Sequence, residues 1–173
     1  FVATNASSNA NASATSANLT AASGTVTIDM SDSTGKYTIT GGSGDNTLKA
    51  GKQDSVVKGE SGDDIIVGDA GADTLTGGAG NDTFTGNAGN DTFNIDSGTD
   101  IINDLGGSSG SDTDILVVSS GATVNATGIK GFVADSGTKN LGGTANLTAA
   151  DGSGRTINMS GANTGAFNLI GGT

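Results

Sequence analysis

The sequence predicts an all-β protein whose chain winds into a parallel β-solenoid, with no helices of note. A nine-residue pattern repeats seven times without interruption over residues 41–103. In the flanks, apolar residues alternate with polar ones, which is typical of half-buried strands. No apolar stripe with the 3.6-residue period of a helix occurs in the 173 residues.

The nonapeptides keep one register from Gly41 to Asn103. They read GGSGDNTLK, AGKQDSVVK, GESGDDIIV, GDAGADTLT, GGAGNDTFT, GNAGNDTFN and IDSGTDIIN. The fourth place is glycine in six of the seven, and the sixth place is aspartate in the last five. The eighth place is always apolar: Leu48, Val57, Ile66, Leu75, Phe84, Phe93 and Ile102. A fixed register of this kind predicts similar units stacked along one axis.

Each nonapeptide combines a turn with a short strand. The first six residues are rich in glycine, so they can adopt positive φ and expose their backbone carbonyls. The last three form a strand that turns only the eighth-place side chain inward, because strand side chains alternate between faces. Two nonapeptides complete one coil, so turns two repeats apart stack on the same side.

Stacking predicts two columns of carboxylates at the sixth place. One column holds Asp64, Asp82 and Asp100, and the other holds Asp73 and Asp91. Stacked carboxylates and turn carbonyls form an all-oxygen cage, which suits Ca²⁺ better than Mg²⁺, because Mg²⁺ requires a strict octahedron and retains its waters. We therefore expect several Ca²⁺ ions, bound by these five aspartates.

Weaker ligands are expected where the pattern fails. Asn46 and Ser55 replace the sixth-place aspartate in the first two nonapeptides, and Gln53 interrupts the glycine pattern. Beyond residue 103 the register is lost, and three aspartates precede the strand-like run 115–118. They could close the last coil with a further ion or serve as ordinary turn residues. The weaker candidates are therefore Asn46, Asp104, Asp112 and Asp114.

Charge is concentrated in the same block. Residues 41–114 hold fourteen acidic residues and three lysines, which account for the whole net charge of −11. These carboxylates repel one another unless cations or solvent screen them. One inward side chain per nonapeptide gives a thin core, so we expect the metal-free block to be disordered or loosely held. Metal binding then supplies the folding free energy.

The nonapeptide at 77–85, GGAGNDTFT, matches the RTX calcium-binding repeat G-G-x-G-x-D-x-U-x without a departure. The block resembles that family over 63 of the 173 residues. The resemblance implies a parallel β-roll with Ca²⁺ between its turns, and export from a Gram-negative cell by a type I machine. The alternative, a disordered Gly/Asp-rich tract, does not explain seven apolar residues in phase.

A longer repeat has a period of about 130 residues. The motif ANLTAA at 17–22 recurs at 145–150, and TIDMS at 27–31 returns as TINMS at 156–160. We therefore expect the chain to be a window from a tandem array. Its regions would be a Ser/Thr/Asn-rich solenoid flank at 1–40, the nonapeptide roll at 41–103, a closing loop and linking strands at 104–131, and the start of a second copy, equivalent to 1–42, at 132–173.

Composition excludes several functions. Without cysteine or histidine, the chain can form no disulfide, no thiolate nucleophile and no Ser-His-Asp triad. The acidic balance argues against nucleic acid, and no apolar run approaches the ~20 residues of a membrane span. We therefore expect no enzymatic activity and no catalytic residues.

These features favour a structural role, as a repeat unit of a large, secreted, calcium-dependent protein on the surface of a Gram-negative-type bacterium. The expected form is an S-layer or an extracellular filament. Its partners would be further copies of itself in a tandem array or homopolymer, with cell-surface polysaccharide as another candidate. The alternatives are the secretion and folding module of a type I-secreted enzyme, such as a protease or lipase, and the extender or ligand-binding part of an RTX adhesin.

Overall fold

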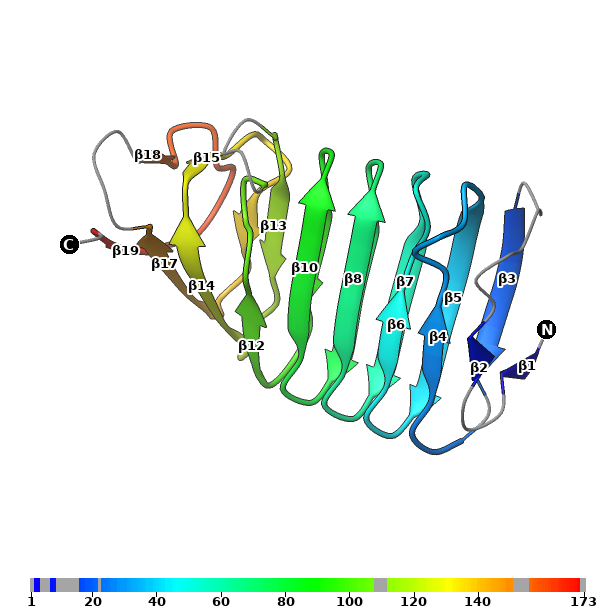
Figure 1. Ribbon diagram of the computed structural model, residues 1–173. Helices are drawn as coiled ribbons and strands as arrows, with labels where there is room; N and C mark the ends of the chain where they lie inside the picture. Colours follow the sequence, from blue (N-terminus) through cyan, green and yellow to red (C-terminus); the bar gives the residue numbers. More distant parts are fainter. Residues whose placement is uncertain are drawn as a thin grey trace.

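The computed structural model shows a β-solenoid in which every strand pair is parallel (Figure 1). It describes residues 2–3, 7–8, 16–21, 23–107, 112–150 and 156–171. The chain alternates between two facing sheets, here called sheet A and sheet B, and advances one strand along each sheet per coil. No helix occurs in these ranges, so the predicted all-β parallel solenoid is confirmed.

Sheet B extends from β2 to β19, and sheet A from β1 to β16. Within the described ranges, sheet A contains β1 (Val2–Ala3), β3 (Ser16–Ala21), β5 (Lys36–Ser43), β7 (Val56–Ser61), β9 (Thr74–Ala79), β11 (Thr92–Ile95), β13 (Ile115–Val118) and β16 (Lys139–Asn140). Sheet B contains β2 (Ser7–Ser8), β4 (Thr27–Asp29), β6 (Thr47–Lys49), β8 (Ile65–Ala70), β10 (Thr83–Ala88), β12 (Thr99–Ile102), β14 (Thr123–Ile129), β17 (Thr144–Ala149) and β19 (Asn168–Ile170). A small separate sheet pairs β15 (Gly131–Val133) with β18 (Thr156–Asn158).

The nonapeptide block stacks with the predicted eighteen-residue coil. On sheet A, Val57 pairs with Leu75, and Leu75 pairs with Phe93. On sheet B, Ile66 pairs with Phe84. All seven eighth-place side chains have no exposed surface, so the predicted inward column forms the core of the roll.

Except for β6, the strands of the block are longer than the predicted three residues. β8, β9 and β10 each have six, because the backbone after the core residue continues to pair with the next coil, as Asp69 does with Asn87. The chain reverses direction at the fourth-place glycines, whose φ lies between +92° and +139°. Side chains other than glycine rarely adopt this conformation, which explains the glycine pattern.

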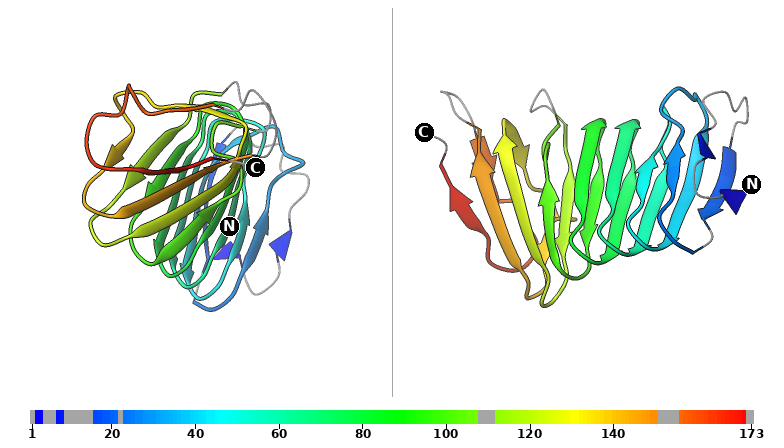
Figure 2. Two further views of the ribbon diagram at one scale, coloured as in Figure 1. Left: turned by 90° about the vertical axis from the view of Figure 1, so that its left-hand side faces the viewer. Right: turned by 60° about the horizontal axis from the view of Figure 1, so that its bottom comes forward.

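The flanks continue the stack with larger coils. β3 pairs with β5 at a spacing of twenty residues, and β11 pairs with β13 at twenty-three. On the outer face of sheet B, the Asn146 amide donates to Asn125 and the Asn168 amide donates to Asn146, each at 2.8 Å. The two further views in Figure 2 show the same continuous stack from its end and from below.

No helix that is long and apolar enough to cross a membrane occurs in the described part of the chain.

The core column allows a direct test. Phe84 has no exposed surface and packs edge-on against Phe93, with ring centroids 6.1 Å apart. We expect Phe84→Ala to lower the unfolding free energy of the calcium-loaded protein by about 3–5 kcal/mol, because it leaves a cavity. Denaturant unfolding in calcium measures this loss.

Ile65→Thr provides the matched control. Ile65 is 48% exposed on the outer face of sheet B, between Thr47 and Thr83. This substitution should change stability by less than about 0.5 kcal/mol. Equal losses for the two variants would contradict the assignment of inner and outer faces.

Candidate metal centre

The sixth-place aspartates lie where the turns meet the strands, in two columns. Asp64, Asp82 and Asp100 stack beside sheet B, and Asp73 and Asp91 stack beside sheet A. Each is only 1% exposed. Such burial of a carboxylate is costly unless partners satisfy it.

One oxygen of each of these carboxylates is satisfied by the preceding coil. The backbone N–H of Asp64 donates to Oδ1 of Asp82, and that of Asp82 donates to Oδ1 of Asp100, both at 2.8 Å. In the other column, the N–H of Asp73 donates to Oδ1 of Asp91 at 2.8 Å. These hydrogen bonds fix the orientation of each aspartate side chain, and they therefore also fix the position of its second oxygen, Oδ2.

The second oxygen is buried and has no hydrogen-bond partner in four of these aspartates. They are Asp64, Asp73, Asp82 and Asp91. A buried polar atom without a partner costs about 1–3 kcal/mol, and more when it is charged. These four Oδ2 atoms are therefore the clearest sign that the turns require a ligand.

The first-place glycines make room for these oxygens. A Cβ atom at Gly68 would lie 2.6 Å from Oδ2 of Asp73 and 2.8 Å from the carbonyl oxygen of Gly86 in the next coil. A Cβ at Gly59 would likewise collide with Oδ2 of Asp64 and lie 2.6 Å from the carbonyl oxygen of Gly77. A carboxylate oxygen and a backbone carbonyl thus meet where a side chain would otherwise be.

This set of donors fits Ca²⁺, which takes six to eight oxygen ligands in flexible geometry. No group of three or more acidic side chains that could hold a metal ion occurs in the described ranges. A cation in the columns would therefore combine carboxylates with backbone carbonyls. Its charge would satisfy the unpartnered oxygens.

Burial raises the pKa of these aspartates. The pKa of Asp73 rises to about 8, and those of Asp91 and Asp100 rise to about 7. The pKa of Asp64 rises to about 6, and that of Asp82 is also raised. Desolvation is the largest cause, and neighbouring carboxylates add to it. Ionisation at neutral pH therefore opposes folding until a cation offsets the charge.

The first two nonapeptides satisfy their sixth-place side chains internally. Asn46 donates from Nδ2 to the Gly44 carbonyl at 2.5 Å and accepts at Oδ1 from the N–H of Val26 at 3.0 Å. Ser55 donates to the carbonyl of Gln53 at 2.7 Å. A neutral donor thus satisfies the turn carbonyl in these two nonapeptides, so these turns need no cation.

The aspartates that follow residue 103 lie at the end of the aspartate column beside sheet A. Oδ1 of Asp114 accepts from the N–H of Asp91 at 2.9 Å, so Asp114 takes the sixth-place position after a longer coil. Its Oδ2 accepts from the N–H of Gly106 at 2.7 Å. Asp104 accepts from two backbone N–H groups, those of Gly86 and Asn87. The sequence alone left these roles open, because five extra residues separate Asp114 from the register.

Asp112 lies at the same end of the roll. Its Oδ2 occupies the space that a Cβ of Gly107 would need. Its charge helps to raise the pKa values of Asp91, Asp104 and Asp114, although burial is the main cause for each. The four weaker candidates therefore adjoin the columns, and the protein itself provides hydrogen bonds to Asn46, Asp104 and Asp114.

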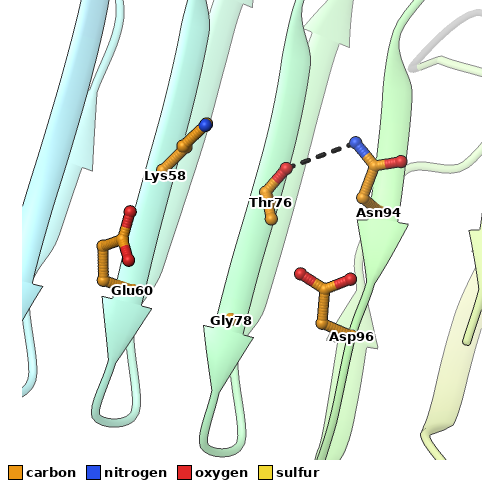
Figure 3. Close-up of a pocket in the computed structure, with 6 residues that line it drawn as sticks. All are labelled: Lys58, Glu60, Thr76, Gly78, Asn94 and Asp96. Atoms are coloured by element: carbon orange, nitrogen blue, oxygen red, sulfur yellow. Dashed lines mark hydrogen bonds between the residues drawn. The ribbon is translucent and has the colours of Figure 1, made fainter.

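A shallow polar pocket on the outer face of sheet A is separate from these columns (Figure 3). It has a volume of about 370 Å³ and opens over β7, β9 and β11, where Gly78 leaves a gap between Glu60 and Asp96. None of the sixth-place aspartates lines it. Its lining residues are Lys58, Glu60, Thr76, Gly78, Asn94 and Asp96.

A comparison with protein families identifies the block. The family model of the RTX calcium-binding nonapeptide repeat, which spans four copies, matches residues 40–75 and again residues 67–102. Residues 40–102 are RTX repeats. No curated protein and no solved structure matches the chain.

RTX repeats bind Ca²⁺ at several sites, so the expected cofactor is confirmed. They are typical of secreted, extracellular proteins of Gram-negative bacteria. The RTX roll is thus a structural, calcium-binding part of this chain. The residues that bind each ion remain a proposal, and the unpartnered Oδ2 atoms support Asp64, Asp73, Asp82 and Asp91 most directly.

Two neighbouring aspartates test this ligand assignment. Asp64 is buried at the sixth place, whereas Asp63 is exposed at the fifth place and accepts from the N–H of Asn81. We expect Asp64→Asn to lower the calcium affinity of the block by about tenfold or more, since losing one charged ligand costs at least about 1.4 kcal/mol. Calorimetric titration measures the change.

Asp63→Asn removes the same charge one residue away and serves as the control. Asparagine already stands at the fifth place in Asn81 and Asn90, where its Oδ1 accepts the equivalent bond. This variant should keep its affinity within about twofold, because only a screened surface charge is lost. If both variants lose affinity equally, the sixth-place assignment is wrong.

Proposed function

We propose that this chain is a structural repeat unit of a large, secreted, calcium-dependent protein at a bacterial cell surface, in an S-layer or an extracellular filament. The observation that carries this proposal is the continuity of the two sheets. β5 of the flank pairs with β7 of the RTX roll, and β12 of the roll pairs with β14 beyond it. The roll is therefore built into a longer solenoid.

The geometry suits a rod. Neighbouring strands lie about 4.8 Å apart, so the nine described strands of sheet B span about 38 Å along the axis. Each coil contacts mainly the coils before and after it, as in other repeat proteins. A rod of this type can be lengthened by copies of itself, in a tandem array or a homopolymer. Cell-surface polysaccharide is a further candidate partner.

Calcium would determine where the rod forms. The buried carboxylates repel one another and have raised pKa values, so the metal-free block resists folding. Calcium is scarce inside a bacterial cell, so the chain would stay unfolded there and remain competent for type I secretion. Calcium is plentiful outside, where it would order the block and stiffen the rod.

Calcium removal tests this proposal. In a chelator, we expect circular dichroism to show mostly disorder over the block, because buried carboxylates lack counter-charges. Adding millimolar Ca²⁺ should restore β signal, and small-angle X-ray scattering should then show an elongated particle. Mg²⁺ is the control cation and should restore far less, since it does not fit irregular oxygen cages.

Two results would contradict the proposal. Equal β content in chelator and in calcium would show that the metal is not needed for folding. A compact particle in calcium would contradict the proposed rod. It would favour the alternative role, in which the block is a folding module attached to an enzyme. The sequence of the whole gene distinguishes these roles further, since an enzyme domain beside the block would support the second.

A further inference from the structure

β19 presents an open strand edge at one end of the described solenoid. It pairs with β17 on one side, and no strand of the described ranges pairs with its other side. Leu169 is 52% exposed and Ile170 is 48% exposed on this strand. Figures 1 and 2 place β19 at the end of the stack, opposite β1 and β2.

One strand pair at this end repeats a pairing of the first coils. In β3 and β5, Leu19 pairs with Ile39. In β17 and β19, Leu147 pairs with Leu169. The sequence repeat of about 130 residues relates these pairs. Leu19 and Leu147 stand in the two copies of ANLTAA, and Ile39 and Leu169 each stand two residues before a Gly-Gly pair. The two strand pairs therefore share the pairing of their inward apolar side chains, although β5 is longer than β19.

The two segments differ in what covers them. The first copy buries its inward side chains almost completely, whereas the second leaves the equivalent side chains open or half-buried. The pairs are Ile28 and Ile157, Met30 and Met159, Tyr37 and Phe167, and Ile39 and Leu169. Ile39 has no exposed surface because β7, the first strand of the RTX roll on sheet A, lies beside β5.

The edge of β19 is short, but its residues do not block pairing with a further strand. It contains no charged residue, no proline and no bulge; natural proteins use such features to block pairing. The ladder from Asn125 through Asn146 also ends at Asn168, on the outer face of this strand. The strand is therefore suited to extension by another parallel strand.

We infer that the segment 156–171 is a docking base for a second copy of the RTX block of this chain. The strand equivalent to β7 would lie beside β19 as β7 lies beside β5. Thr38, Ile39 and Thr40 pair with Val56, Val57 and Lys58. Asn168, Leu169 and Ile170 would pair with the second copies of those residues. This inference rests on the proposed function, in which copies of the chain are its partners.

An extended chain tests the inference. A second copy of residues 44–131 is appended after Thr173, which keeps the period of the repeat. Hydrogen exchange of the β19 amides is measured in calcium, in the original and extended chains. We expect exchange to slow by about tenfold or more in the extended chain, because the strand becomes internal to a sheet.

The control is the same extension with the second copies of Asp64, Asp73, Asp82, Asp91 and Asp100 replaced by asparagine. It has the same length and core residues but should not fold with calcium, so β19 should exchange as in the original chain. Equal exchange in the original chain and the unaltered extension would overturn the inference. Calcium binding by the original and the extended chain is measured in a separate titration. If the RTX block does not bind calcium, that result contradicts the proposed function and not this inference.

A substitution gives an independent measure. Leu169→Asp should change the stability of the original chain little, because Leu169 is half exposed there. In the extended chain Leu169 would be buried, so the same substitution should shift the unfolding equilibrium constant by at least a further tenfold, or about 1.4 kcal/mol. Val133→Asp is the matched control, since Val133 is 54% exposed on β15. It should have equal effects in both chains. An equal cost of Leu169→Asp in both chains would also overturn the inference.

Discussion

The carboxylate of the sixth-place aspartate is the group on which the RTX roll depends. Its Oδ1 accepts a hydrogen bond from the coil before it, which sets the spacing of the stack. The same bond turns Oδ2 toward a first-place glycine and a backbone carbonyl, where no protein donor is available. One side chain thus provides both the structural contact between coils and the requirement for a cation.

Glycine has two different uses around this carboxylate. At the fourth place it allows the positive φ that reverses the chain, as in Gly80. At the first place φ is ordinary, and glycine is needed because a Cβ at Gly77 would collide with Oδ2 of Asp82. The glycine at the fourth place is therefore required by the backbone conformation, and the glycine at the first place is required by the space that a ligand needs.

Much of this arrangement could be predicted from the sequence. The inward column and the two aspartate columns follow from the nine-residue register, because each coil repeats the same contacts. The length of the strands could not be predicted, since pairing of residues such as Asp69 and Asn87 depends on neighbouring coils. The position of Asp114 was equally inaccessible, because an insertion hides its equivalence to a sixth-place residue.

The neutral sixth-place side chains at the start of the roll have a mechanical consequence. Asn46 and Ser55 hold their turns with hydrogen bonds inside the protein, so the junction between flank and roll carries no buried charge. Buried charge begins at Asp64 and extends to Asp100 and Asp114. When calcium is withdrawn, the loss of order should therefore be centred on the segment from Asp64 to Asp114, and the first junction should be affected least. Compliance is thus confined to one segment, and the calcium concentration sets how far that segment can bend or stretch.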